Sequence, residues 1–254
     1  MKEKLHVGTM GWSYNFWIGS FYPENTTSEN FLNEYSKIFS TVEVDSTFYR
    51  IPYAETVRKW KSQTPEDFIF SAKFPRVITH DKMLKGCGRE LEVFIENMSL
   101  MEGKLGPMLM QFPPGFKPDQ LDTLKEFISI LPKGYRYAVE VRNKKWLEEK
   151  FYNLLRDHGI ALVRIDNPLM PKIDTLTADF TYIRWEGDRK TIKGKLGKVE
   201  KDRSSEIRDW SGQIKRLMEE SIEVFGYFSK YYSGFPPGDV KMMLDSLQAT
   251  QSRN

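Results

Sequence analysis

The chain has 254 residues, of which 40% are hydrophobic and 29% are charged, a composition typical of a globular protein. Its 38 Lys and Arg residues nearly balance its 35 Asp and Glu residues, for a net charge of +3, which excludes a polycation and makes any preference for anions a local property. A single cysteine, Cys87, excludes an internal disulfide and a multi-cysteine metal site.

Short apolar runs rich in β-branched and aromatic residues alternate with longer amphipathic segments. In the latter, apolar residues recur every three or four positions, as in Leu91, Phe94, Ile95 and Met98, which predicts helices with one buried face. The apolar runs predict eight strands, at residues 5–10, 41–45, 67–73, 107–112, 136–142, 160–166, 180–185 and 222–228.

Strands that alternate with helices indicate a parallel sheet joined by crossovers. The predicted fold class is α/β, a single (β/α)8 TIM barrel with outer helices over residues 1–247 and a frayed tail at 248–254. An open doubly wound sheet is the alternative, but no Gly-rich phosphate turn follows the first strand. The start of the chain has no signal-peptide core and no apolar run approaches about 18 residues, so we expect a cytoplasmic protein without a membrane partner.

Charged residues end several of the predicted strands. Side chains at i and i+2 point to one face of a strand, so Glu140 and Arg142 share a face opposite Val139 and Val141. The same alternation pairs other polar residues near strand ends: Glu43 with Asp45, Arg164 with Asp166, and Ser71 with Lys73, while Gln111 and Arg184 lie on two more strands. Because barrel enzymes carry catalytic groups at the carboxyl ends of strands, this pattern predicts a site there.

A purely structural interpretation accounts for the same charges. Glu43, Asp45, Glu140 and Asp166 are balanced in number by Lys73, Arg142, Arg164 and Arg184. Burying unpaired charges costs roughly several kcal/mol each, so they would then pair off as a fixed ionic plug.

One segment, residues 188–204, interrupts the alternation of strands and helices. It holds seven basic and three acidic residues with few apolar ones and follows the seventh predicted strand. It is either a solvated surface loop or a mobile basic lid over an anionic ligand.

The runs GTMGWSYNFWIGSFYP, EVDSTFYRIP, TPEDFIFSAKFPRVITH, LGPMLMQFPP, AVEVRNKKW and YIRWEG together resemble the YecE-like family, catalogued as domain of unknown function 72. The resemblance covers about nine tenths of the chain and implies a (β/α)8 barrel with a site at the strand ends, without an established activity. It carries over as site positions Trp12, Ser13, Tyr14, Thr47, Phe48, Tyr49, Lys73, His80, Gln111, Glu140 and Arg142. The chain departs from the family pattern at Asp45, where asparagine is usual, and at Ser229 and Lys230, where the family shows an asparagine pair.

These residues support several chemistries. Lys73, Arg142 and Arg184 would grip an anion, Glu140 or Asp166 would act as general base, and His80 would transfer protons near neutral pH or merely cap a loop. Glu43 and Asp45, with Glu140 and Asp166, would bind Mg or Mn. The aromatic side chains around Trp12, Tyr14 and Tyr49 are either packing or a stacking platform for a flat ligand.

Three functions remain open on this basis. The first is a hydrolase or lyase acting on an anionic, phosphate-bearing small molecule. The second is a nucleotide-binding or nucleic-acid-binding protein without turnover, whose binding would be sensitive to salt. The third is a scaffold in which all the charges pair.

Overall fold

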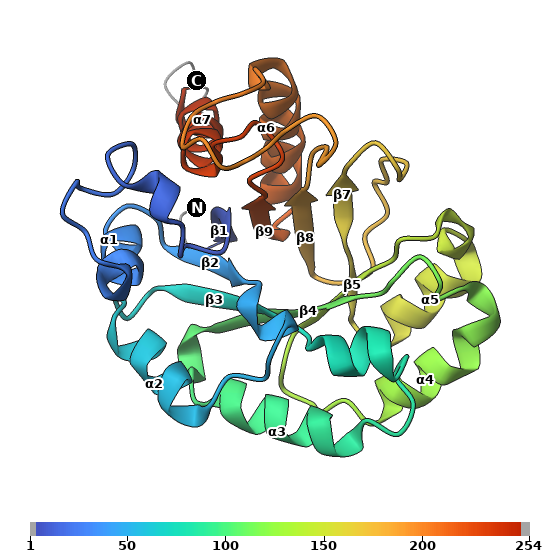
Figure 1. Cartoon of the computed structure of the whole chain (residues 1–254). Helices are drawn as coiled ribbons and strands as arrows, with labels where there is room; N and C mark the ends of the chain where they lie inside the picture. Colours follow the sequence, from blue (N-terminus) through green and yellow to red (C-terminus); the bar gives the residue numbers. More distant parts are fainter. Residues whose placement is uncertain (1–3, 250–254) are drawn as a thin grey trace.

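The strands form one parallel sheet in the computed structural model, which describes residues 4–249. Figure 1 shows the strands at the centre of the molecule with helices around them. The strand bounds are β1 Leu5–Met10, β2 Thr41–Val44, β3 Ile69–Lys73, β4 Leu105–Gln111, β5 Tyr137–Glu140, β6 Ala161–Leu162, β7 Arg164–Asp166, β8 Phe180–Trp185 and β9 Glu223–Phe228.

The sheet forms a nearly closed barrel, and its two ends meet at the sixth predicted strand. Residues 160–166 appear as two short strands, β6 and β7, separated by Val163. β6 pairs with β5, and β7 pairs with β8. The first and last strands of the sheet are therefore the two halves of one continuous segment. The Val163 amide still donates to the Val139 carbonyl at 2.9 Å. The predicted parallel barrel is therefore confirmed, and the open doubly wound sheet is not the architecture.

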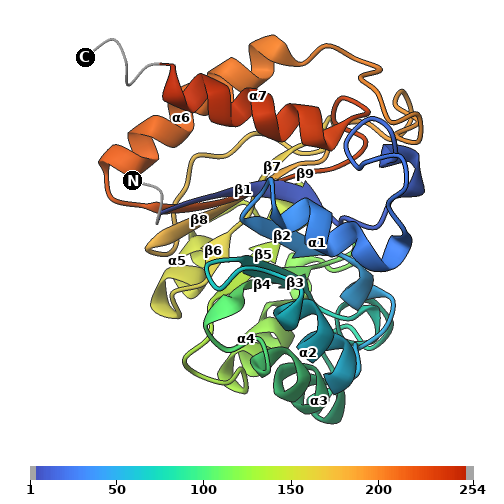
Figure 2. The same ribbon diagram turned by 90° about the vertical axis from the view of Figure 1, so that its left-hand side faces the viewer.

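The helices cover the outside of the barrel (Figures 1 and 2). Among residues 4–249, no helix links β7 to β8, and residues 167–179 run irregularly there. Pro168 and Pro171 lie in this segment and disfavour helical backbone, while the Asn167 side chain accepts hydrogen bonds from the amides of Leu169 and Met170. The helix bounds are α1 Phe31–Ser36, α2 Ala54–Ser62, α3 Gly88–Ser99, α4 Leu121–Ser129, α5 Glu149–Asp157, α6 Ser204–Glu219 and α7 Pro236–Gln248.

Two hydrophobic layers hold the barrel together. Outward-facing strand residues such as Val42 and Val139 pack with the buried helix faces in a large outer core. Inward-facing residues such as Ala138, Tyr182 and Tyr227 form a smaller core inside the barrel. The two faces of each strand are thus both buried, which is why the strands read as nearly continuous apolar runs. The core inside the barrel ends below the polar side chains at the carboxyl ends of the strands.

The ends of the chain are only partly described. Gln248 still belongs to α7, whereas residues 250–254 of the predicted tail lie outside the described residues. The domain limits stay a prediction. Within 4–249, no helix is long and apolar enough to cross a membrane.

Candidate functional site at the carboxyl ends of the strands

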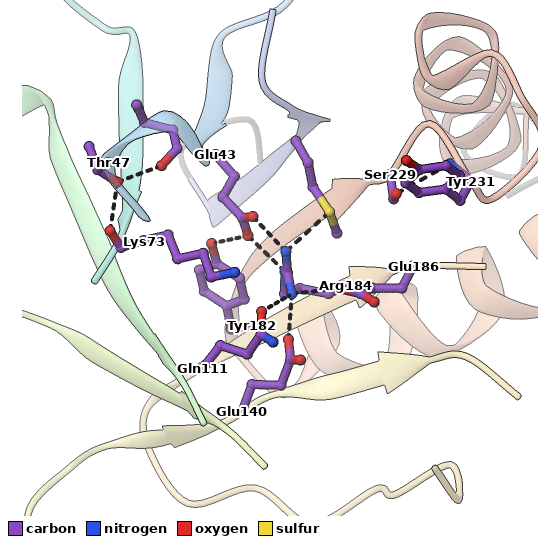
Figure 3. A network of polar contacts seen from close by, with 12 residues as sticks. Glu43, Thr47, Lys73, Gln111, Glu140, Tyr182, Arg184, Glu186, Ser229 and Tyr231 are labelled. Atoms are coloured by element: carbon purple, nitrogen blue, oxygen red, sulfur yellow. Dashed lines mark hydrogen bonds and ion pairs between the residues drawn. The ribbon is translucent and has the colours of Figure 1, made fainter. Parts of the chain in front are cut away.

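Arg184 is the centre of the polar cluster at the carboxyl ends of the strands (Figure 3). It lies on β8, two residues after Tyr182, and therefore points inward like that residue. Its Nε and Nη2 donate to the two carboxylate oxygens of Glu43 at 3.0 and 2.8 Å, and the Tyr182 hydroxyl also donates to Glu43 at 2.8 Å. This two-point pairing fixes the planar guanidinium against β2.

Two more carboxylates complete the coordination of Arg184. Its Nη1 donates to Glu140 Oε2 at 2.6 Å and to Glu186 Oε1 at 2.7 Å. Arg142 forms ion pairs with Glu140 and, at 2.5 Å, with Glu186. We call these five residues, Glu43, Glu140, Arg142, Arg184 and Glu186, the paired floor.

The paired floor is almost inaccessible to solvent. Glu43 and Glu140 are fully buried and Arg184 is 3% exposed. Burial raises the pKa of Glu186, but the guanidiniums of Arg184 and Arg142 outweigh it and hold that pKa at about 2. Removing one member of such a group leaves an uncompensated buried charge. The ionic plug predicted as the structural alternative is therefore present for these five residues, although its members differ from those expected.

Lys73 lies beside the paired floor and has no such partner. It is the last residue of β3, and its side chain extends toward the cluster in Figure 3. Its Nζ lies 4.0 Å from the centre of the Phe48 ring, and among residues 4–249 it makes no hydrogen bond or ion pair. Burial, then the nearby Arg184, lowers the pKa of Lys73 to about 8, against the attraction of Glu140 and Glu43.

Asp45 and Lys230 are the other charged groups without an ion pair here, as judged within the described part of the chain. Asp45 follows β2 and is partly buried, and this burial raises the pKa of its carboxyl even though Lys73, Arg184 and Lys230 oppose it. Lys230 follows β9, and its Nζ lies 5.3 Å from the ring centres of Tyr14 and Tyr231. Asp45 and Lys230 are thus electrostatic neighbours of opposite sign.

His80 and Tyr14 lie near these groups. His80 belongs to a π-helical turn, Val77–Asp81, and its ring lies 4.9 Å from that of Phe48. Burial and then Lys73 lower the pKa of His80, so the imidazole is neutral near pH 7. The Tyr14 hydroxyl donates to the Met10 carbonyl at 2.9 Å, and burial raises its pKa.

The other predicted ligand-binding residues lie in different surroundings. Trp12 packs edge-on against Trp60 and Phe70 in the outer core. Thr47 is fully buried and donates to the Val44 and Lys73 carbonyls, so it positions the backbone of Lys73. Tyr49 is 80% exposed, and Gln111 accepts a long 3.5 Å contact from Arg184.

Asp166 and Arg164 do not join the cluster, and the expectation that they face the barrel mouth is wrong. Asp166 accepts a hydrogen bond from Trp210 Nε1 on α6 at 2.7 Å, and Arg164 donates to Gln213 on the same helix at 2.8 Å. Ala161 and Val163 fill the barrel interior instead. The alternation rule grouped these residues correctly, but it cannot say which face of a strand buried on both sides points inward.

No metal site follows from the acidic residues. Within residues 4–249, no three His, Cys, Asp or Glu side chains are grouped to hold a metal ion. Both Glu43 oxygens already accept from Arg184, so of the two predicted metal ligands only Asp45 is without an ion pair in the described structure. A requirement for Mg or Mn stays a prediction.

Cys87 is buried and donates weakly to the Leu84 carbonyl, and burial raises its thiol pKa.

The basic segment 188–204 lies beside the segment after β1, at the same end of the barrel (Figure 2). Gly197 has φ +61°, and a Cβ placed there would lie 2.1 Å from the Phe16 carbonyl oxygen. Glu200 accepts hydrogen bonds from the amides of Lys193 and Gly194, and its own amide donates to the Ser233 carbonyl. The basic side chains of segment 188–204 from Arg189 to Lys201 are exposed. The backbone is thus tied to neighbouring loops while the cations face solvent.

Two surface hollows, of about 450 and about 400 Å³, lie away from this cluster. The first is lined by residues of α2 and of the segments before β3 and β4, among them Lys104. Its ammonium is already bonded to the Lys61 and Thr64 carbonyls. The second is lined mainly by α3 side chains with Ile130 and Pro132. Neither therefore competes with the strand ends as a site for chemistry.

Two members of the cluster were not predicted from the sequence. Glu186 and Tyr182 lie two residues on either side of Arg184 in the run YIRWE. The same i and i+2 rule that grouped Glu140 with Arg142 applies to them. Applied one position beyond the end of the strand predicted at residues 180–185, the rule identifies Glu186.

The fold and the polar strand ends define an α/β barrel protein of the TIM-like class. The family model "Protein of unknown function DUF72" matches residues 6–254, and the chain belongs to this family.

Relatives and solved structures agree with this assignment. The chain is 33% identical over 168 residues to the UPF0759 protein YecE of Escherichia coli K12, a match that covers 64% of this chain and 59% of that protein. It is 27% identical to the UPF0759 protein YunF of Bacillus subtilis, across 98% of this chain and 96% of YunF. The crystal structure of a DUF72 family protein from Thermotoga maritima superposes with a TM-score of 0.79 at 28% identity, covering 96% of this chain and 99% of that one.

Proposed function

We propose that the protein is an enzyme that acts on a small anionic, phosphate-bearing substrate at the carboxyl ends of the barrel strands, by lyase or hydrolase chemistry. One observation carries the proposal: Lys73, Asp45 and Lys230, from three different strand ends, have no ion pair among residues 4–249, whereas each of the five charged residues of the paired floor forms at least one ion pair. Charged side chains that are partly buried and unpaired are costly, and such groups cluster at functional sites.

The roles follow from which groups are already engaged. Both oxygens of Glu140 contact Arg184 or Arg142, so we assign proton transfer to Asp45 rather than to Glu140. Arg142 and Arg184 are likewise occupied by carboxylates, which leaves Lys73 and Lys230 to hold the anion. The paired floor then keeps β2, β5 and β8 in register beneath the reacting groups.

The first test is calorimetric titration with inorganic phosphate and pyrophosphate. Lys73→Met and Lys230→Met should each weaken binding about tenfold or more, because each removes one direct charge contact. Lys133→Met is the matched control, since Lys133 is exposed in the segment after α4, and it should bind like the wild type. Equal binding by all four proteins would refute the site.

The second test separates turnover from binding. A panel of phosphorylated small molecules is assayed with the wild type and with Asp45→Asn, which retains the size of the side chain but cannot accept a proton. We expect a substrate whose kcat falls at least 100-fold in Asp45→Asn, in line with the usual contribution of a general acid or base, while phosphate binding persists. An unchanged kcat would remove Asp45 from the mechanism.

A nucleotide-binding or nucleic-acid-binding protein without turnover is the second candidate, favoured by the exposed cations of segment 188–204. It predicts that affinity for a single-stranded oligonucleotide falls steeply with salt, by a log–log slope of about 0.7 per phosphate contacted. Lys193→Gln, Lys195→Gln and Lys198→Gln together should reduce that slope by about 2. An unchanged slope in the triple variant would exclude this surface.

A further inference from the structure

We propose that Lys73 is a catalytic amine that forms a Schiff base with the carbonyl carbon of an anionic substrate, so that the reaction is a carbonyl-dependent lyase reaction. This inference rests on the proposed function and adds the substrate class. It starts from a difference between Lys73 and the two arginines of the paired floor: Lys73 carries a primary amine, lies at a strand end, and has no hydrogen-bond or ion-pair partner among the described residues.

The other cations of the cluster do not suit this role. Arg142 and Arg184 are guanidiniums, which stay protonated in proteins, and both are bonded to carboxylates. Lys230 lies among the rings of Tyr14, Phe16 and Tyr231, and we assign it to the phosphate of the substrate. Lys73 is the remaining nitrogen nucleophile.

The surroundings of Lys73 favour its neutral form. Burial and the Arg184 charge lower its pKa to about 8, so about one tenth of the amine is neutral at pH 7, compared with about 0.04% for an unperturbed lysine. The lone pair of the neutral amine is what attacks a carbonyl. The neutral fraction is therefore roughly 200 times larger than on a surface lysine.

The chemical step balances with groups of this chain and water. The Nζ lone pair attacks the carbonyl carbon, the π electrons move to oxygen, and a proton passes from nitrogen to oxygen to give a carbinolamine. The Asp45 carboxyl protonates the hydroxyl, which leaves as water while nitrogen forms the C=N bond. The bond between the α- and β-carbons then breaks: the Asp45 carboxylate takes the proton of the β-hydroxyl, the β-carbon leaves as a carbonyl compound, and the bond pair turns the iminium into an enamine. Asp45 returns that proton to the α-carbon, and hydrolysis of the re-formed iminium by one water releases the carbonyl product, the amine and a proton, which restores the Asp45 carboxyl.

Asp45 and Lys230 have matching parts in this step. Burial raises the Asp45 pKa, which keeps a proton on that carboxyl at higher pH than usual and suits an acid. The Lys230 ammonium would hold the phosphate of the substrate. The charges of Lys73 and Lys230 both act on Asp45 and oppose the effect of burial on its pKa.

The competing role for Lys73 is that of a distant counterion. The paired floor has three carboxylates and two guanidiniums, and Lys73 supplies the third positive charge without touching a carboxylate. A counterion would remain protonated and would show no special reactivity toward carbonyl compounds.

Reductive trapping separates the two roles. The protein is incubated with dihydroxyacetone phosphate, or with uncharged hydroxyacetone, in the presence of sodium cyanoborohydride, and the modified lysines are located by peptide mass spectrometry. We expect the adduct on Lys73 to form at least tenfold faster than on Lys133, and its rate to rise through pH 8. An adduct spread evenly over exposed lysines, with Lys73 unmodified, would overturn the inference.

Two variants control for folding and for the proposed function. Lys73→Arg keeps the positive charge and should keep the wild-type unfolding midpoint and phosphate binding while losing the adduct. Lys230→Met should slow trapping of dihydroxyacetone phosphate but leave trapping of hydroxyacetone unchanged. If the wild type binds phosphate but Lys73 is not trapped, the Schiff base is refuted and the proposed function is not. If the wild type does not bind phosphate, the proposed function is refuted.

Discussion

Replacing Arg184 by methionine tests the account of the paired floor most directly. Methionine fills much of the same volume without charge, so the change removes the hydrogen bonds to Glu43, Glu140 and Glu186. Of the three buried carboxylates, Glu140 and Glu186 then keep an ion pair with Arg142, and Glu43 has no ion pair among the described residues. Breaking a buried ion pair by removing one partner costs roughly 3–5 kcal/mol. For a chain of this size, about 2–4 °C per kcal/mol converts this into a loss of roughly 6–20 °C in Tm.

The pH dependence of this loss provides a second readout. In the wild type the pKa of Glu186 is held at about 2, below its unfolded value, so Glu186 stabilises the fold above about pH 4 and this contribution is lost as the pH falls toward 2. In Arg184→Met the pKa values of the three carboxyls that lose Arg184 should rise. As the pH falls, protonation of these carboxyls removes buried negative charge and so reduces the destabilisation of the variant. The difference between the two proteins in urea unfolding should therefore shrink between pH 7 and pH 4.

The matched control is Arg89→Met. Arg89 pairs with Glu92 on the exposed face of α3, and its loss should not shift the unfolding midpoint measurably. A loss below about 1 kcal/mol in Arg184→Met, or a loss independent of pH, would refute the view that the charges of the paired floor depend on one another.

Three further predictions concern other parts of the chain. Gly197→Ala should expose segment 188–204 to limited trypsin cleavage, because its Cβ would meet the Phe16 carbonyl at 2.1 Å and its φ is +61°; an unchanged cleavage pattern would contradict this packing. Asp239→Asn should gain stability relative to the wild type as the pH rises from 4 to 8 in urea unfolding. Burial raises the pKa of Asp239 to about 8, so over this range the unfolded wild-type chain releases the proton that the folded protein keeps, and the wild type loses stability; parallel pH profiles would refute it. Asp166→Asn should lower the unfolding midpoint through its bond to Trp210 but leave phosphate binding intact, and weaker phosphate binding would place Asp166 back in the site.

The sequence predicted the barrel because its strands and helices follow strict periodicities. It also predicted that Glu43 and Glu140 point inward, since Val42 and Val139 occupy the opposite face. The same rule failed for Arg164, because a strand buried on both faces offers no solvent side as a reference and the break at Val163 leaves no mark in the pattern. Placing a residue in the barrel interior requires knowledge of what its strand neighbours point toward.

Pairing partners were beyond the reach of the sequence for a different reason. Arg184 meets Glu43 across 141 residues of chain, and nothing local distinguishes it from Arg142 or Arg164 as the central cation. The division into matched and unmatched charges therefore exists only in three dimensions.

That division argues for chemistry rather than for stability alone. A barrel that needed only ionic stabilisation would leave each charge paired, because an unpaired, partly buried ammonium lowers the stability of the fold. Here four of the five residues of the paired floor, Glu43, Glu140, Arg184 and Glu186, are buried, and the unpaired Lys73, Asp45 and Lys230 lie where the strands end. Preorganised catalysis requires reactive groups that are held in place but not engaged in ion pairs with one another. Lys73, Asp45 and Lys230 above the paired floor fit this requirement, and the trapping experiment on Lys73 tests whether the protein uses them for catalysis.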